Sequence, residues 1–264
     1  MNRKVSRVLA LAACAALSTA VIADATSFKV RSGKLEATLG GTVSPSKLPK
    51  GQLAPVKTNI TGKIETTDDS HPPALREVVV DIDKDAAIDS TGLPVCKAAQ
   101  LEAQNTPNAK KVCGAAIVGT GLAHAEIAFP EQPPITVTSP ITVFNGGTSG
   151  GKTKLLIHTF ITVPVPAAIV TQVVVSKKGA GLRSVARIPV IVGGSGSVLD
   201  FKFKLGRNYT YKGRKRSLLS AKCPDGRFKV SSPKILFKNE AAIEGFPAQT
   251  VLKGSVLVPC TPKG

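Results

Sequence analysis

The sequence predicts an all-β, antiparallel β-sandwich, either one large body or two lobes, and three observations lead to this prediction. First, several segments alternate apolar and polar residues, as a strand does when one face is buried and the other meets water. Second, other segments are continuously β-branched and apolar, which suits strands covered on both faces. Third, Gly, Pro, Asn and Ser cluster between these segments and are typical of turns. The alternating segments are 34–39, 56–66, 135–143 and 201–205, and the continuous ones are 155–163, 169–175 and 188–192.

Two segments interrupt the strand pattern. One short helical excursion is expected around 97–105, because residues 97–104 are rich in Ala, Leu, Glu and Gln and an Asn-Thr-Pro sequence at 105–107 follows as a helix stop. The Pro-rich stretch 131–134 is the expected boundary if the body has two lobes.

The N-terminus has the pattern of an export signal. Three basic residues lie among the first seven, an apolar stretch runs from 8 to 16, and small residues continue to the cleavage site. Cleavage is expected after Ala23 or Ala25, which leaves residues 26–264 as a secreted body. The apolar stretch is too short for a membrane span, which needs about 20 apolar residues, and no span is expected elsewhere in the mature chain.

Cys14 offers an alternative to simple cleavage. Residues 11–14 read Leu-Ala-Ala-Cys, the pattern of a bacterial lipobox, in which the cysteine becomes a lipidated N-terminus. The hydrophobic run continues past Cys14, where a lipoprotein tether normally turns polar. Cleavage further on, with Cys14 discarded, is therefore the favoured outcome.

Four cysteines remain in the exported body, and an even number in an oxidising compartment predicts two disulfides. The pairs Cys96–Cys113 and Cys223–Cys260 are favoured among the three connectivities because they close the short loops. Zinc is the alternative, but the spacings contain no C-x-x-C pair and no His lies near a Cys. No metal and no cofactor are expected.

Lys and Arg outnumber Asp and Glu by 35 to 17, and their distribution is uneven. Residues 1–25 hold three of the basic side chains and one acid, so the mature body keeps 32 basic and 16 acidic residues and a net charge of +16. Residues 65–102 contain nine acids and three bases, whereas residues 132–224 contain fourteen bases and the single acid Asp200. This asymmetry predicts either a surface that faces an anionic envelope polymer, lipid or extracellular nucleic acid, or self-association between unlike halves.

Basic and aromatic residues interleave most densely at 201–216. Such a segment could bind single-stranded nucleic acid or another polyanion by charge and stacking. The alternative is an ordinary strand with its aromatic residues in the core, followed by a basic hairpin tip at 213–216. The basic residues are Lys202, Lys204, Arg207, Lys212, Arg214, Lys215 and Arg216, and the aromatic ones are Phe201, Phe203, Tyr209 and Tyr211.

Residues 146–153 match two catalytic patterns, but their context favours neither. The run Gly-Gly-Thr-Ser-Gly-Gly-Lys-Thr fits a phosphate-binding loop, yet a β-branched segment follows it where a helix N-terminus is needed, so no nucleotide is expected. The same missing helix argues against Ser149 as the nucleophile of a hydrolase elbow. A triad in which His71 or His124 precedes Ser195 has no local support.

Three aspartates at alternate positions, Asp81, Asp83 and Asp85, are similar to part of a calcium loop. Ala86 stands where the loop needs a turn glycine, and Gly92 where it needs a bidentate Glu. A strand with these acids on its wet face is favoured instead.

Several segments together resemble an uncharacterised family of secreted actinobacterial proteins, over most of the chain from about 58 to 260. These segments are 92–96, 113–121, 143–146 and 217–226. The resemblance implies export and a shared cysteine-containing scaffold, and it assigns no activity and no site residues.

The sequence thus predicts a secreted or cell-envelope-associated β-sandwich that is a non-catalytic structural or binding module. One alternative is polyanion binding through the basic segment at 202–216. The other is an extracellular hydrolase whose site is assembled from residues distant in the sequence, and for it no catalytic residue is named.

Overall fold

The structure is a computed structural model, and it describes residues 26–129 and 132–263. The expected signal peptide at 1–25, with Cys14, lies outside the described residues, as do residues 130 and 131 at the expected lobe boundary. No helix in the described part of the chain is long and apolar enough to cross a membrane.

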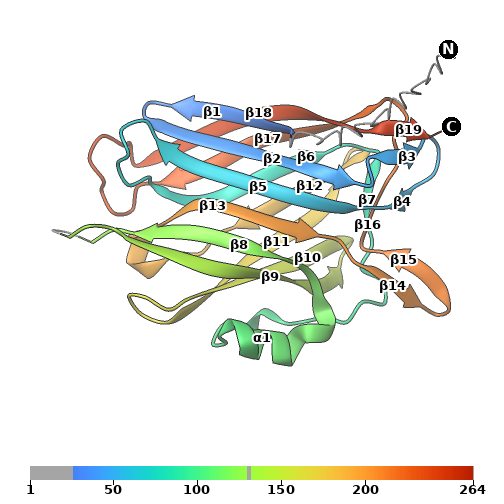
Figure 1. The fold of residues 1–264 in the computed structure, drawn as a ribbon, viewed down its shortest axis with the longest axis horizontal. Coiled ribbons are helices and arrows are strands. Elements are labelled where there is room, and N and C mark those ends of the chain that lie inside the picture. Colours follow the sequence, from blue (N-terminus) through green and yellow to red (C-terminus); the bar gives the residue numbers. More distant parts are fainter. Residues whose placement is uncertain (1–25, 130–131, 264) are drawn as a thin grey trace, which may run out of the picture.

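Twelve strands form one sheet in which every neighbouring pair is antiparallel, so the all-β prediction is confirmed (Figure 1). The predicted alternating and continuous segments supply six of its twelve strands. In spatial order the strands are β1 (Thr26–Ser32), β2 (Leu35–Ser44), β5 (Lys57–Thr66), β13 (Gly196–Leu205), β8 (Ile117–Ile127), β9 (Ile135–Ser149), β10 (Lys152–Ile161), β11 (Ala167–Lys178), β12 (Gly181–Arg187), β6 (Ala74–Ile82), β17 (Arg227–Lys238) and β18 (Gln249–Pro259).

The sheet curls into two facing layers until its first and last strands meet. In Figure 1, β2, β5, β13 and β8 cross in front of β6, β12 and β11. At the meeting edge, the Phe28 ring of β1 lies directly over Gly254 of β18 and leaves no room for a side chain there. Phe28 packs in one cluster with Leu252 of β18, Leu35 of β2 and Phe237 of β17, so the core spans both layers.

Short strands cover one end of the molecule, at the right in Figure 1. They form two small sheets. One pairs β3 (Lys47–Pro49) with β19 (Thr261–Lys263), and the other places β16 (Leu219–Ala221) between β4 (Ala54–Pro55) and β7 (Ala86–Ile88). The Cys223–Cys260 disulfide lies in the apolar cluster beneath them.

The helical excursion exists, but the helix begins where the sequence predicted its end. Only a 3₁₀ turn, η1 (Ala98–Gln100), lies in 97–104, whereas α1 spans Thr106–Cys113. Asn105 is its N-cap, with its side chain accepting from Asn108 N at 2.9 Å. Pro107 falls in the first turn, where the missing N–H has no helical partner to lose. Residues that were expected to stop a helix therefore start one.

The excursion packs on the outer face of β9, β10 and β11. The Cys96–Cys113 disulfide, also as predicted, lies there in a cluster with Phe144, Leu156 and Ala116, after which a 3₁₀ turn, η2 (Gly114–Ala116), leads into β8. His158 of β10 is fully buried under it; its Nε2 lies 2.9 Å from Gln104 O, and burial lowers its pKa. Strand β10 is thus covered on both faces, as its continuous apolar run predicted.

The segment 188–192 is not a strand, which corrects the prediction from its β-branched composition. β12 ends at Arg187, and the chain then crosses to the other layer through a 3₁₀ turn, η3 (Val192–Gly194), before β13 begins. Pro189 cannot donate to a strand ladder. Instead, Arg76 holds the crossing, donating to the carbonyls of Ile188 and Pro189 and pairing with Glu240.

Candidate ligand-binding cavity

The two layers enclose a cavity of about 420 Å³. Its walls come from alternate residues of nearly every strand of the large sheet, because successive side chains of a strand point to opposite faces. On β13 the sequence Phe-Lys-Phe-Lys-Leu turns Phe201, Phe203 and Leu205 to the cavity. Facing them across the interior are apolar residues of the other layer, among them Val173, Val175, Leu182 and Ala186.

Small residues create the space. Gly62 of β5 lies under the Phe201 ring and Gly121 of β8 under Phe203, at contacts so close that neither position admits a Cβ. Ser184 and Ala186 of β12 line the opposite wall with short side chains. The rings of β13 lie against the glycines of their own layer, and the side chains opposite them are short. The interior between them is therefore not filled by protein atoms, whereas an ordinary protein interior is close-packed.

The cavity wall is apolar. None of the described residues that line it is Asp, Glu, Lys or Arg. Its polar side chains are Ser and Thr hydroxyls with Asn59 and His124. Some of the hydroxyls already have partners: Ser139 Oγ donates to Phe160 O at 2.9 Å, and Ser232 Oγ donates to Val79 O at 2.8 Å. Thr58 Oγ1 is buried and has no hydrogen-bond partner in the described part of the chain. The cavity therefore suits an apolar molecule with at most a few polar atoms.

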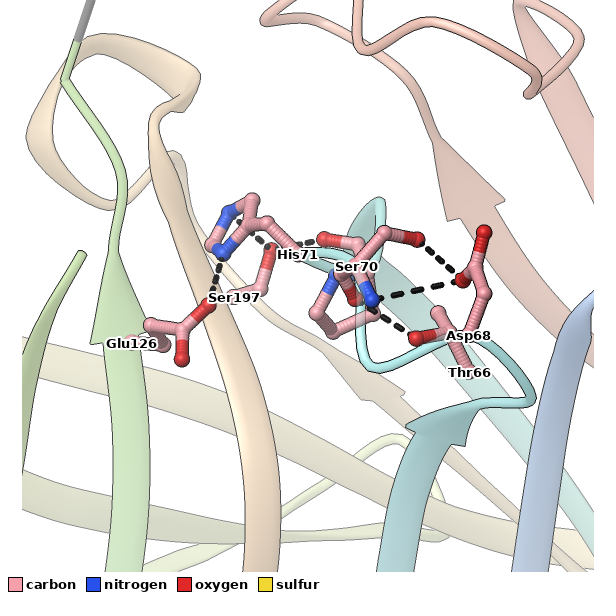
Figure 2. A network of polar contacts seen from close by, with 7 residues as sticks. Thr66, Asp68, Ser70, His71, Glu126 and Ser197 are labelled. Atoms are coloured by element: carbon pink, nitrogen blue, oxygen red, sulfur yellow. Dashed lines mark hydrogen bonds and ion pairs between the residues drawn. The ribbon is translucent and has the colours of Figure 1, made fainter. Parts of the chain in front are cut away.

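A Ser–His–Glu contact lies near one end of the sheet, and Figure 2 shows it. His71 Nδ1 is 2.5 Å from Glu126 Oε1, and its Nε2 is 3.2 Å from Ser197 Oγ. Sequence reasoning considered His71, but with Ser195 as its partner. Beside it, Thr66 at the end of β5 donates to Ser70 O, and Ser70 Oγ donates to Asp68 in the β5–β6 loop, as the same figure shows.

This contact lacks the proton geometry of a catalytic triad. Ser197 Oγ donates to Pro72 O at 2.6 Å, so its only proton points away from the imidazole. A nucleophilic serine needs the opposite direction, in which the histidine takes the proton. Ser197 is also only 1 % exposed, which leaves no approach for a substrate. The contact fastens the β5–β6 loop to β8 and β13.

Of the seven residues predicted to bind a polyanion, Arg207 and Arg216 are engaged within the chain and the other five are exposed. Lys202 and Lys204 lie on the outer face of β13, and Arg207 donates to the carbonyls of Ala115 and Ile117. The other four belong to a hairpin that projects from the body, formed by β14 (Asn208–Tyr211) and β15 (Arg214–Ser217). There Arg216 pairs with Asp89 at 2.7 Å, while Lys212, Arg214 and Lys215 are exposed.

The aromatic residues of the same segment are engaged elsewhere. Phe201 and Phe203 face the cavity, as the alternative interpretation predicted. Tyr209 donates to the carbonyl oxygen of Thr91 at 2.9 Å, and the Tyr211 ring covers Gly92. None of these four rings is presented for stacking with a base.

Acidic and basic parts of the chain pair with each other inside one molecule. β6, from the acidic part, lies beside β12, from the basic part. Arg183 donates to both carboxylate oxygens of Asp81, at 2.6 and 2.8 Å, and with Lys178 it lowers the pKa of Asp81 to about 2. Arg187 pairs with Glu77 at 3.4 Å in the same way. Much of the charge asymmetry is thus neutralised by ion pairs between neighbouring strands.

The aspartates of the incomplete calcium pattern go to separate partners. Asp81 pairs with Arg183, Asp83 accepts from the backbone N–H of Asp85 and Lys229, and Asp85 pairs with Lys222 at 3.4 Å. In residues 26–129 and 132–263 no group of three His, Cys, Asp or Glu is placed to hold a metal ion.

Residues 146–153 form the hairpin between β9 and β10, with Gly150 and Gly151 at positive φ in the turn. Strands flank the loop on both sides, and no helix follows it. Neither the phosphate-binding nor the nucleophile-elbow pattern is realised.

Comparison with models of known protein families, with curated proteins and with solved structures gives no match for this chain. The cavity and its surroundings are therefore the basis on which a function can be inferred.

Proposed function

We propose that the protein is a secreted, non-catalytic binding module that holds an apolar, lipid-like ligand in the cavity between its two layers. The observation that carries the proposal is the size of the cavity together with its apolar wall. Ligand pockets commonly measure about 300–1,000 Å³, and 420 Å³ falls in that range.

The energetic cost of such a space supports the proposal. An apolar space in a protein interior is unfavourable when nothing fills it, because the side chains around it lose packing contacts. An apolar ligand would replace the lost packing contacts and recover much of this free energy.

The compartment fits this role. Two disulfides are typical of proteins in an oxidising space, which agrees with the export expected from the N-terminus and from the resemblance to secreted actinobacterial proteins. A lipid-like molecule outside the cell needs a protein to shield it from water, because its apolar surface is unfavourable there. The hydrolase alternative loses support because the described Ser–His–Glu contact has the wrong proton direction.

A binding experiment tests the proposal. The fluorescent fatty acid cis-parinaric acid is titrated into delipidated protein, and mass spectrometry identifies apolar molecules extracted from the protein as purified. Saturable binding at a single site is expected. Absence of both parinaric acid binding and extractable apolar molecules would refute the proposal.

A pair of neighbouring substitutions locates the binding site. Ser184→Leu adds bulk to the cavity wall and is expected to weaken parinaric acid binding about tenfold, the effect of ~1.4 kcal/mol of crowding. Val185→Leu adds one carbon on the outer face of the same strand, because Ser184 and Ala186 line the cavity and Val185 does not. It is expected to leave the affinity unchanged, and an equal loss in both variants would place the ligand elsewhere.

A further inference from the structure

The sheet has a notch at the end opposite the small sheets. β11 pairs with β12 only from Gln172 onward, so the backbone of 167–171 has no ladder partner on that side among the described residues. β12 ends at Arg187, opposite Glu77, while β6 continues to Ala74. Past Arg187 the chain keeps one backbone hydrogen bond to β6, from Ile188 N–H to Arg76 O at 2.9 Å, and β11 and β6 then extend beyond it with no strand between them.

The cavity reaches this notch. Ile169 on the β11 side, Leu75 on the β6 side and Ile188 at its base all line the cavity. Exposure along β11 changes at the same point: Val173 and Val175 are buried, whereas all residues of 167–171 are half-buried. On β11 the wall is thus more accessible where β12 is missing, whereas Leu75 and Ile191 at the same end are buried.

Exposed apolar side chains surround the notch. Val163 and Val165, in the loop between β10 and β11, are 46 % and 65 % exposed, and Val190, just beyond the end of β12, is 59 % exposed. The two segments share one apolar cluster, because Val192 packs with Ile161 and Ala167, which flank the loop. We call Val163, Val165 and Val190 the apolar rim.

We propose that the notch is the entrance to the cavity and that the apolar rim contacts a lipid surface from which the ligand is loaded. The proposal rests on the proposed function, and it names the source of the ligand. A long apolar molecule has little free concentration in water, so transfer during contact with a lipid surface avoids exposing it. The rim places apolar side chains in that surface at the point where the cavity opens.

Two observations favour a lipid surface over a protein partner. The rim has only a few side chains, whereas a standard protein interface takes about 20–30 residues on each side. The mature chain also carries a net charge of +16, which attracts the protein to anionic lipid.

The test compares loading from vesicles with binding at equilibrium. Parinaric acid is placed in vesicles of equimolar phosphatidylcholine and phosphatidylglycerol that contain a nitroxide quencher, and its transfer to the protein restores fluorescence. The rim variant carries Val163→Ser, Val165→Ser and Val190→Ser. Its matched control carries Val95→Ser, Val112→Ser and Leu257→Ser, three side chains that are each about half exposed and lie away from the notch.

The rim variant is expected to load about tenfold more slowly or worse, because three apolar contacts with the lipid are lost. The control is expected to load at the wild-type rate, and both variants should keep the wild-type equilibrium affinity and circular dichroism spectrum. Loading by the rim variant at the wild-type rate overturns the entrance and leaves the proposed function standing. If wild-type protein binds no parinaric acid at equilibrium, the proposed function itself fails.

The alternative role of the apolar rim is contact with a second copy of the chain. It predicts a wild-type protein whose sedimentation coefficient rises with concentration and a rim variant that stays monomeric. That result would assign the rim to a second copy of the chain and would overturn the lipid contact. A wild-type monomer whose loading slows with added salt supports it, because salt screens attraction to the anionic vesicles.

Discussion

Ala186→Leu is expected to stabilise the protein, which is an unusual outcome for a bulky substitution inside a fold. Ala186 of β12 lines the cavity, so the three added carbons enter space that protein atoms do not fill. At about 0.8 kcal/mol per buried carbon, the gain is ~2.4 kcal/mol. Ordering the leucine side chain costs about 0.5–1 kcal/mol, which leaves a net stabilisation of about 1.5–2 kcal/mol.

Calorimetry and guanidinium unfolding of delipidated protein measure this effect. For a chain of this length, 1 kcal/mol shifts Tm by roughly 2–4 °C, so a rise of about 3–8 °C is expected. Val185→Leu, on the outer face of the same strand, should change stability by less than about 0.5 kcal/mol. Destabilisation of Ala186→Leu by about 1–3 kcal/mol, as in an overpacked interior, would show that the space does not exist. The ligand proposal would then lose its main support.

The remaining predictions concern the contacts around the cavity. Arg183 lowers the pKa of Asp81, so this ion pair stabilises the fold above about pH 4, and the stabilisation is lost as the pH falls toward 2. In Asp81→Asn the free energy of unfolding should therefore change by about 1 kcal/mol less over this pH range, a value that allows for solvent screening. Ser197→Ala should lower the free energy of unfolding by about 1–2 kcal/mol and leave hydrolysis of p-nitrophenyl esters at the background rate; an esterase activity lost in this variant would contradict the purely structural assignment. Replacing Cys223 and Cys260 by Ser opens a loop with a sequence separation of 37 and should cost about 4 kcal/mol in denaturant unfolding, whereas an unchanged midpoint would show that this bond is dispensable.

Local sequence signals predicted the strands well because strand periodicity is a local property. β5, β9, β10, β11 and β13 all follow the segments that alternate or run continuously apolar. The errors fall where tertiary contacts override composition. Residues 188–192 have strand composition, but Arg76 binds the carbonyls of Ile188 and Pro189 and the chain leaves the sheet. At α1, Asn105 and Pro107 were predicted to end a helix, but they start one. Asn and Pro occur both at the first turn of helices and just after their last turn, so composition alone does not distinguish the two ends.

The cavity could not be predicted in the same way, because it depends on how far the sheet curls and on which strands face each other. The alternating pattern correctly predicted that Phe201, Phe203 and Leu205 face the interior, but it predicted an interior filled by side chains. A signal was nevertheless present. Ala123 on β8 and Ser184 and Ala186 on β12 are small residues at inward positions of strands, where a packed core would place larger ones. Such positions mark a wall that is shaped to leave room.

The two ends of the molecule are held by different kinds of bond, and this difference agrees with the direction of loading. Covalent bonds constrain the covered end and the outer wall: Cys223–Cys260 lies beneath the small sheets, and Cys96–Cys113 holds the excursion against β9 and β10. At the notch end, polar contacts perform this task, chiefly Arg76 with Glu240. The segment 188–195, which borders the notch, contains no cysteine and is held by these hydrogen bonds and by the packing of Val192 with Ile161 and Ala167. Because local opening costs less free energy where no covalent link holds the chain, the end at which we propose that the ligand enters is the less constrained of the two.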